Sequence, residues 1–303
     1  MRSKNQECHL PAARIGGTLF MKTLIDNVRK RTFSRRHAPH HPDAPILALK
    51  DVTVRYESGV GLDDVSFDLM EGERVAVVGP NGAGKSTLFK VIAGVIDPVE
   101  GAVEVYGHEP GGHVCISYIP QRSQVDWSFP VTVADVVMMG RISKIGPFRI
   151  PSPDDWQEVE EALRLVEMAD LSKRQIGELS GGQQQRMFVA RSVAQEAELM
   201  LMDEPLTGLD VPSRENVMRA LNALSAKGVT LMVSMHDLQL AADHYDRIML
   251  LNKSLITFGP PEQVFKKEYL AEAYEGRIHF IEGEMDQMVV EDSCCEGERD
   301  EMA

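Results

Sequence analysis

The sequence predicts an α/β fold built around a mainly parallel β-sheet. Short buried strands alternate with amphipathic helices over most of the 303 residues, a pattern typical of a parallel sheet that helices cover on both faces. A glycine-rich turn joins one buried strand to a helix, and another buried strand ends in two adjacent carboxylates. These three observations together define the expected fold class.

The first half of the chain is rich in strands, and the middle is helical. Strands are expected over 47–56, 65–69, 74–78, 102–106 and 115–119. Residues 132–141 carry apolar side chains at helical spacing, and Ser152 opens a helix that runs to Met168, with Pro153 at its first position. Strands then alternate with helices again, over 199–203 (strand), 212–226 (helix), 229–235 (strand), 238–244 (helix) and 247–251 (strand).

The turn between strand 74–78 and the helix after it fits a phosphate-binding loop. It matches the pattern G-x-x-x-x-G-K-[ST] and consists of Gly79, Pro80, Asn81, Gly82, Ala83, Gly84, Lys85, Ser86 and Thr87. Such a turn aims several backbone N–H groups at one point, with the positive end of a helix dipole behind them. Lys85 is expected to reach the β- and γ-phosphates, and the Ser86 hydroxyl to ligate Mg²⁺. The sequence therefore predicts a site for a nucleoside triphosphate.

The strand over 199–203 ends in the second part of the predicted catalytic site. Asp203 is suited to hold Mg²⁺ through water, and Glu204 is placed to polarise the attacking water as a general base. Adjacent acids also occur at ordinary strand ends, so this interpretation depends on the phosphate loop upstream.

A second glycine-rich turn lies shortly before that strand. Ser180 is suited to cap the helix that follows, and Gly181 and Gly182 let its N-terminal amides approach a ligand closely, with Gln183 ending the run. The turn therefore predicts a second anion site in the same chain.

The order of these motifs resembles the ATP-binding-cassette ATPases, whose signature Leu-Ser-Gly-Gly-Gln lies shortly before the strand with the two carboxylates. The resemblance runs from about residue 46 to about residue 265. It implies a P-loop NTPase (RecA-like) core with a mainly parallel sheet, an N-terminal antiparallel β subdomain and an inserted α-helical subdomain at about 122–185. It also implies that the nucleotide is ATP. The cassette would occupy 45–280, between extensions at 1–44 and 281–303.

The same resemblance gives roles to four further residues. Tyr56 resembles the aromatic residue that stacks on adenine, although a strand tyrosine can also simply pack in a core. Gln121 matches the glutamine that approaches Mg²⁺ and the attacking water. Asp210 matches the aspartate of the loop that follows the two carboxylates, and His236 matches the histidine that contacts the γ-phosphate. Glu204, His236, Gln121 and Lys85 then form the expected catalytic set.

In the cassette ATPases two nucleotide-binding domains pair head to tail. Each ATP lies between the phosphate loop of one subunit and the signature of the other. By this resemblance one chain holds only half of each site, and a second copy of the chain is an expected partner.

The composition is ordinary for a soluble globular protein, with 43% hydrophobic and 26% charged residues. No apolar stretch approaches the roughly 18 residues needed to cross a bilayer, and the N-terminus lacks a signal-peptide pattern. Four cysteines form no disulfide framework in a chain of this length, which favours a reducing cytosol. The expected location is therefore the cytoplasmic face of the cell membrane, peripherally bound.

The net charge of −14 is unevenly spread. Residues 1–44 have a balance of +6 and residues 281–303 a balance of −8, so the cassette carries −12, which argues against nucleic acid as a partner. Both ends are expected to be solvated, disordered extensions, and the basic one has contact with anionic lipid as its alternative. Met21 is an alternative start. The histidines near residue 40 and the pair Cys294-Cys295 lack the spacing of a zinc site.

The segment after Gln121 is where a membrane partner is expected to dock. Trp127 and Phe129 lie next to a proline and are suited to a socket for a permease helix, or else fill the helical subdomain's own core. Residues 121–130, 136–141 and 153–156 resemble importers for manganese, zinc or iron, which act through a separate membrane permease and an extracytoplasmic substrate-binding protein. Transport of another solute, export, and a soluble cassette of repair or translation remain as alternatives.

Overall fold

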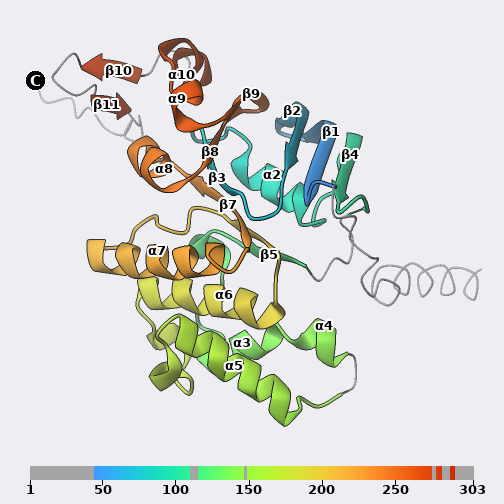
Figure 1. Cartoon of the computed structure of the whole chain (residues 1–303), viewed down its shortest axis with the longest axis vertical. Coiled ribbons are helices and arrows are strands. Elements are labelled where there is room, and N and C mark those ends of the chain that lie inside the picture. Colours follow the sequence, from blue (N-terminus) through green and yellow to red (C-terminus); the bar gives the residue numbers. More distant parts are fainter. Residues whose placement is uncertain (1–43, 110–114, 147–148, 275–277, 282–286, 291–303) are drawn as a thin grey trace, which may run out of the picture. The chain divides into compact units, whose positions relative to one another are not determined.

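The computed structural model describes residues 44–109, 115–146, 149–274, 278–281 and 287–290 (Figure 1). They belong to one compact unit, His40–Ala303. The predicted basic extension and most of the acidic one lie outside the described residues, and the predicted boundaries at 45 and 280 stay a prediction.

A six-stranded sheet forms the centre of this unit. Its strands lie in the order β5-β6-β7-β3-β8-β9, and neighbouring strands are parallel except for β8 and β9. Their bounds are β3 Arg74–Val78, β5 Ile116–Ile119, β6 Leu199–Met202, β7 Thr230–Met235, β8 Arg247–Asn252 and β9 Ser254–Gly259. Every residue of β6 and β7 is buried, as expected of strands with helices or strands on both faces. The predicted mainly parallel sheet is confirmed.

A smaller antiparallel sheet has the order β2-β1-β4. Its bounds are β1 Leu47–Tyr56, β2 Gly59–Leu69 and β4 Glu100–Val105. On β2, Val65, Phe67 and Leu69 are buried and alternate with exposed residues, so one face of the strand points into a core and the other into solvent. This sheet is the predicted antiparallel β subdomain.

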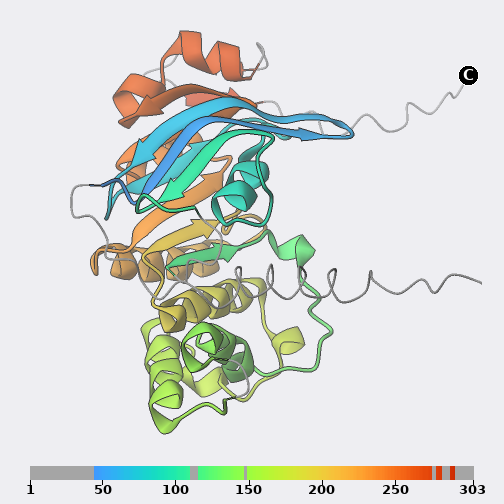
Figure 2. The same cartoon turned by 90° about the vertical axis from the view of Figure 1, so that its right-hand side faces the viewer.

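The helices fall into two groups. One group packs on the central sheet, and the other forms an insertion in the chain between β5 and β6. Figures 1 and 2 show the inserted helices (green to yellow) gathered at one end of the central sheet. The helix bounds are α2 Lys85–Ile92, α3 Val133–Met139, α4 Ile142–Ile145, α5 Pro153–Leu165, α6 Gly181–Gln195, α7 Val211–Ser225, α8 Leu238–His244, α9 Pro261–Val264 and α10 Lys267–Ala273. Short 3₁₀ turns occur at Arg122–Gln124, Ala169–Leu171 and Ile176–Glu178.

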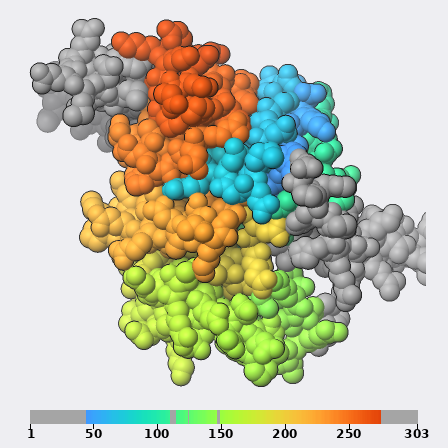
Figure 3. Space-filling model, viewed as in Figure 1, coloured from blue at the N-terminus to red at the C-terminus, as the bar shows by residue number. Residues whose placement is uncertain are grey.

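Two hydrophobic clusters hold these layers together. One lies between the antiparallel sheet, α2 and the central sheet, and includes Phe67, Phe89 and Met249. The other joins the inserted helices to α7 and the central sheet, and includes Met187 and Leu221. In the space-filling view, the yellow to light-orange layer that contains α6 and α7 lies between the green inserted segment and the orange and blue parts of the chain above it (Figure 3). The inserted helices therefore pack on the nucleotide-binding core through α6 and α7.

The C-terminal half of α6 is tied to β5 by polar contacts. Arg191 donates to the carbonyl of Tyr118 at 3.0 Å, and Gln195 Nε2 donates to the carbonyl of Ile116 at 2.7 Å. The hydroxyls of Ser117 and Ser192, both buried, lie 2.6 Å apart. Helix α6 is thus attached directly to the strand that leads to Gln121.

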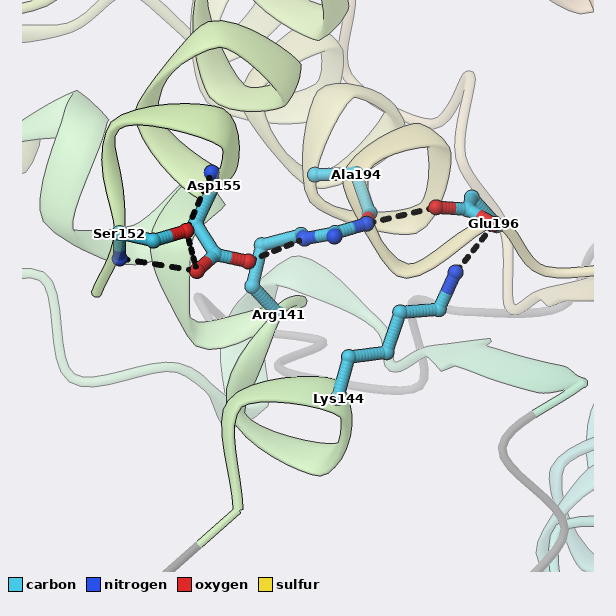
Figure 4. Close-up of polar contacts among 6 residues, drawn as sticks. All are labelled: Arg141, Lys144, Ser152, Asp155, Ala194 and Glu196. Atoms are coloured by element: carbon cyan, nitrogen blue, oxygen red, sulfur yellow. Dashed lines mark hydrogen bonds and ion pairs between the residues drawn. The ribbon is translucent and has the colours of Figure 1, made fainter. Parts of the chain in front are cut away.

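A buried arginine joins three of the inserted helices (Figure 4). Arg141, only 9% exposed, lies between α3 and α4, and its Nε donates to Asp155 Oδ1 of α5 at 3.2 Å. Its Nη1 donates to Glu196 Oε1 at 2.6 Å and to the carbonyl of Ala194 at 3.2 Å, both at the end of α6. Lys144 pairs with the same Glu196. Asp155 also forms a capping box with Ser152, at the helix start that the sequence predicts for α5.

Several elements lie outside the sequence-based expectations. Strand β2 begins at Gly59 rather than at 65, and α4, β9, α9 and α10 were not predicted. Strands β10 Ile278–Ile281 and β11 Gln287–Val290 form an antiparallel hairpin that extends into 281–303, where the sequence predicted no ordered structure. Across the described ranges, no helix is both long and apolar enough to cross a membrane.

Candidate active site

The phosphate loop connects β3 to α2 at the carboxyl edge of the parallel strands. Lys85, the first residue of α2, is 6% exposed, and its Nζ donates to the carbonyls of Gly79 at 2.6 Å and Pro80 at 3.2 Å. The ammonium group therefore turns back over the loop, where it lies beside any phosphate that the loop amides bind.

Two glycines of the loop approach neighbouring backbone too closely for any other residue. Gly79 and Gly84 both have positive φ, and a Cβ on Gly79 would lie 2.0 Å from the carbonyl oxygen of Leu251. A Cβ on Gly84 would lie 2.4 Å from the carbonyl oxygen of Gly61. The loop is thus wedged between β8 and β2, which holds its amides in a fixed orientation.

Glu204 is the centre of the site. His236 Nε2 lies 2.6 Å from Glu204 Oε1, and Gln121 Nε2 donates to Glu204 Oε2 at 3.0 Å. The Thr207 hydroxyl donates to the same Oε2 at 3.4 Å. The three predicted residues come from the ends of β5, β6 and β7, which are neighbours in the sheet. The structure thus brings Gln121, Glu204 and His236 together.

The electrostatics of the site keep Glu204 ionised. The hydrogen bond from His236 lowers the pKa of Glu204, and it outweighs burial of the carboxyl, which raises the pKa. The charges of His236 and Lys85 and the Thr207 hydroxyl lower the pKa further. A carboxylate of this kind is available to accept a proton from water.

A buried serine supports the two carboxylates. Ser234 of β7 donates to Asp203 Oδ1 at 2.8 Å and accepts from the backbone N–H of Glu204 at 2.8 Å. Glu204 has a left-handed backbone (φ 48°), an arrangement that costs free energy and persists where its surroundings hold it. Ser234 therefore holds Asp203 and Glu204 in the orientation in which their side chains point apart.

Asp203 has the donor set that a hard cation needs. Its side chain is 3% exposed, and its Oδ2 is buried without a hydrogen-bond partner in the described part of the chain. A buried carboxylate oxygen left unpaired is costly unless a cation or an ordered water satisfies it. With the Ser86 hydroxyl on the adjacent phosphate loop, the oxygen ligands present fit Mg²⁺.

Tyr56 lies at the end of β1 beside the phosphate loop. Its ring is 43% exposed, and its hydroxyl lies 3.2 Å from the Thr87 hydroxyl of α2. A Cβ on Gly61 would lie 2.6 Å from the Tyr56 ring, so this glycine leaves room for the ring. An exposed aromatic face next to the loop is available for stacking, and the ring is not part of the core.

The signature residues form a second group, on α6. Ser180 caps this helix, as predicted, and the structure adds a reciprocal box with Gln183. A Cβ on Gly182 would lie 2.6 Å from the Ser213 side chain of α7, and Asp210 caps α7 by accepting from the Ser213 backbone N–H at 3.0 Å. The predicted Asp210 therefore lies beside the signature rather than in the group around Glu204.

Trp127 and Phe129 have different surroundings. Trp127 packs edge-on against Phe188 of α6, with ring centroids 5.7 Å apart, and donates to the carbonyl of Arg122 at 3.1 Å. Phe129 is 57% exposed. Phe129 is therefore the more exposed of the two aromatic side chains.

Sequence reasoning missed three supporting residues, namely Gly61, Thr207 and Ser234. Ser234 carried a signal, because it is the lone serine in the otherwise apolar stretch that precedes His236. Thr207 lies three residues before Asp210, in the loop that the family resemblance identifies, and Gly61 lies in a short segment without a distinguishing pattern.

Comparisons with known proteins agree with this geometry. The family model described as ABC transporter matches residues 62–207. The manganese transport system ATP-binding protein MntB of Bacillus subtilis is 44% identical over 78% of this chain and 94% of its own length. The zinc transport system ATP-binding protein TroB of Treponema pallidum is 43% identical over 77% of this chain and 88% of its own length.

Solved structures give the same result. An inward-facing conformation of a metal-chelate type ABC transporter matches with a TM-score of 0.69 and 27% identity, over 81% of this chain and 95% of the other. The ATP-binding cassette MJ0796, in a dimeric post-hydrolysis state bound to ADP and phosphate, matches with a TM-score of 0.63 and 27% identity, over 71% of this chain and 98% of the other. This chain belongs to the ABC transporter family, as an ATP-binding cassette that hydrolyses ATP in the service of transport.

Proposed function

We propose that this ATPase drives the transport of a metal ion (manganese, zinc or iron) or a metal chelate through a separate membrane permease. The relatives at 43–44% identity are named for manganese and zinc transport, and one structural neighbour is of the metal-chelate type. In this proposal an extracytoplasmic binding protein delivers the cargo, and the chain works at the cytoplasmic face of the membrane.

The contacts of Glu204 carry the proposed mechanism. Glu204, held between His236 and Gln121, accepts the proton of the attacking water, while His236 and Lys85 stabilise the charge of the γ-phosphate. The loop amides of residues 79–87 hold the phosphates, and the Tyr56 ring stacks on the adenine. Positioning and charge stabilisation account for the chemistry, because phosphoryl transfer needs little covalent help from the protein.

Ser86, Asp203 and Gln121 are the proposed ligands of Mg²⁺, of which Asp203 acts through water. The bound cation would neutralise charge on the β- and γ-phosphate oxygens. The unpartnered Oδ2 of Asp203 supports this assignment.

The complete site is proposed to need two chains. Ser180, Gly181, Gly182 and Gln183 lie on α6, and the cassette structure bound to ADP and phosphate is dimeric. In the proposed homodimer the signature of one chain covers the phosphate loop of the other, with Asp210 at the junction. ATP closes this dimer because it contacts both chains, and hydrolysis removes the phosphate that joins them.

The inserted helices are the proposed docking site for the permease. Five of the ten large hydrophobic side chains exposed in the described chain fall within 129–156, namely Phe129, Met139, Ile142, Ile150 and Trp156. Exposed apolar side chains gathered in one segment commonly mark an interaction site.

A single substitution tests the proposed mechanism. Glu204→Gln removes the base but keeps the shape of the site, so ATP turnover should fall by at least about 100-fold while ATP binding persists. Turnover is measured with the purified protein and Mg²⁺, and binding with a fluorescent ATP analogue. Turnover close to that of the wild type would exclude Glu204 as the base.

The cargo is tested separately, by uptake of radiolabelled manganese, zinc and iron in cells that lack the chain. The wild-type chain should restore uptake of at least one metal, and Lys85→Ala should restore none. Unchanged uptake of all three metals in the deleted cells would contradict the proposed cargo without affecting the ATPase assignment.

A further inference from the structure

Two neighbouring residues, Gln121 and Arg122, contact different parts of the site. Gln121 Nε2 donates to the proposed base Glu204 at 3.0 Å. Arg122 instead contacts α6, where its Nε donates to Gln184 Oε1 at 2.6 Å. Gln184 directly follows the signature residues 180–183. Adjacent residues of one short segment therefore reach the base and the signature helix of the same chain.

The guanidinium group of Arg122 lies against the signature turn itself. A Cβ on Gly181 would lie 3.1 Å from Arg122 Nη1 and 3.2 Å from Leu209 Cδ2. Leu209 is the residue before Asp210 in the chain. The side chains of Arg122 and Leu209 thus limit where the first turn of α6 can lie.

The backbone of Arg122 is tied to the same helix. Trp127 Nε1 donates to the carbonyl of Arg122 at 3.1 Å, and the Trp127 ring packs edge-on against Phe188 of α6. Gln184 and Phe188 are four residues apart, so they lie on the same face of the helix. Consecutive turns of α6 therefore hold the side chain and the backbone of Arg122.

Burial distinguishes this contact from an ordinary surface hydrogen bond. Gln184 is only 4% exposed, and its amide oxygen would lose its donor if Arg122 were removed, which costs free energy at a buried position. Arg122 itself is exposed, so its removal takes no packing from the hydrophobic core. We therefore expect Arg122 to matter more for the orientation of the signature turn than for the stability of the fold.

We propose that Arg122 is a positioning residue of the signature half of the composite site. It holds the turn 180–183 in the orientation in which this turn meets the ATP bound by the other chain. The proposal rests on the two-chain site proposed above. Its consequence is that Gln121 acts on the ATP of its own chain, whereas Arg122, the next residue, acts on the ATP of the partner.

The first test separates ATP binding from turnover. Arg122→Ala should lower turnover at saturating ATP at least about tenfold, because a misplaced signature turn cannot close over the phosphates. Affinity for a fluorescent ATP analogue should stay within about twofold, because the phosphate loop is intact. Arg164→Ala removes an exposed arginine of α5 and should change neither quantity. Wild-type turnover in Arg122→Ala would overturn the proposal, and so would an equal loss of affinity and turnover.

The second test asks whether Arg122 acts through Gln184. Gln184→Leu removes the acceptor but keeps an apolar side chain of similar size, so it should reproduce the loss of turnover in Arg122→Ala. The two substitutions together should lower turnover no further than the larger single loss, because both remove the same contact. Losses that multiply would show that the two residues act independently and would overturn the proposal.

The third test shows which ATP Arg122 serves. In a mixed dimer of Arg122→Ala and Lys85→Ala, one site combines an intact Lys85 from the first chain with an intact Arg122 from the second. An equal mixture should therefore reach about a quarter of wild-type turnover. If Arg122 acted on the ATP of its own chain, this site would be defective as well, and turnover would stay at or below the roughly one tenth that Arg122→Ala retains. That result would overturn the proposal.

A parallel mixture of Ser180→Asp with Lys85→Ala separates this result from the two-chain site on which it rests. Ser180→Asp places a negative charge in the signature itself. Recovery of turnover with Ser180→Asp but not with Arg122→Ala would overturn the role of Arg122 alone. No recovery in either mixture, although mixed dimers form, would overturn both proposals.

Discussion

At the scale of single residues, two glycines of the phosphate loop share a left-handed backbone but differ in their surroundings. Gly82 has φ 80° and open space where a Cβ would point, whereas Gly84 has φ 95° and the carbonyl oxygen of Gly61 at 2.4 Å from that position. The left-handed backbone disfavours alanine equally at both sites. Any difference in stability between Gly82→Ala and Gly84→Ala therefore measures the steric contact of position 84 with Gly61.

Gly82→Ala should therefore lower the free energy of unfolding by only about 1–2 kcal/mol, the cost of the left-handed conformation. Gly84→Ala should cost about 1–3 kcal/mol more, because the loop must move away from β2, and it should weaken binding of a fluorescent ATP analogue far more than Gly82→Ala does. Urea unfolding measures the first quantity. Equal losses of stability in the two variants would show that the contact with Gly61 is unimportant.

Glu204 links the chemistry of the site to the stability of the fold. Its pKa in the folded chain is lowered from the ordinary value of 4.5, first by the hydrogen bond from His236. A lowered pKa means that the unfolded chain binds more protons than the folded one between the two pKa values. The resulting stabilisation is complete above pH 4.5 and is lost as the pH falls through the folded-state pKa.

In Glu204→Gln the free energy of unfolding should consequently fall less steeply than in the wild type as the pH drops below 4.5, because the amide does not titrate. Free energies of unfolding measured from neutral pH to about pH 3 test this difference in slope. Glu160→Gln removes an exposed carboxyl that pairs with Arg164 of the same helix, and it serves as the control for the loss of one charge. A slope in Glu204→Gln equal to that of the wild type would contradict the lowered pKa.

At the scale of elements, Arg141 connects α3, α5 and α6 through one guanidinium group. Its Nε and Nη1 contact Asp155 and Glu196, which come from opposite sides (Figure 4). Removing one partner from a buried ion pair leaves the other charge poorly solvated. Glu196 is half exposed and can regain water, which limits the expected loss.

Arg141→Met should lower the free energy of unfolding by about 2–3 kcal/mol, somewhat below the range for a fully buried pair. Arg141→Lys keeps the charge but cannot donate to both carboxylates at once, so it should lose an intermediate amount. Urea denaturation of the three proteins gives the order. A loss below about 0.5 kcal/mol in Arg141→Met, typical of exposed pairs, would mean that the inserted helices do not depend on this contact.

The elements also differ in how well the sequence predicted them. Strand β3, α5 and α8 follow from buried runs and cap residues that act locally, and their observed bounds agree with the expected ones to within a few residues. Strand β9 was missed because its residues are mostly half-buried, without the alternation that marks a strand. The 3.0 Å contact of Gln121 with Glu204 joins residues 83 positions apart, so no local pattern contains it. The family resemblance predicted the roles of Gln121 and Glu204. The two residues lie close together because β5 and β6 are neighbours in the sheet.

At the scale of the whole molecule, the proposed site draws Lys85 and Glu204 from one chain and Ser180 from another. Ser180→Asp is a suitable probe, because aspartate caps a helix as well as serine does but adds a negative charge against the phosphate. Lys85→Ala removes the opposite half of the site. Each variant alone should be inactive, since both sites of its symmetric dimer carry the defect.

Mixing the two inactive variants should restore ATP turnover. In a mixed dimer one site combines both defects, while the other has an intact Lys85 and an intact Ser180, so an equal mixture should reach about a quarter of wild-type turnover. Lys85→Ala mixed with Glu204→Gln is the matched control and should stay inactive, because each chain then spoils its own catalytic half. Turnover is measured after the variants are mixed and allowed to exchange subunits. If the mixture of Ser180→Asp and Lys85→Ala also stays inactive although mixed dimers form, the signature acts within its own chain. The proposal of a site shared between two chains is then wrong.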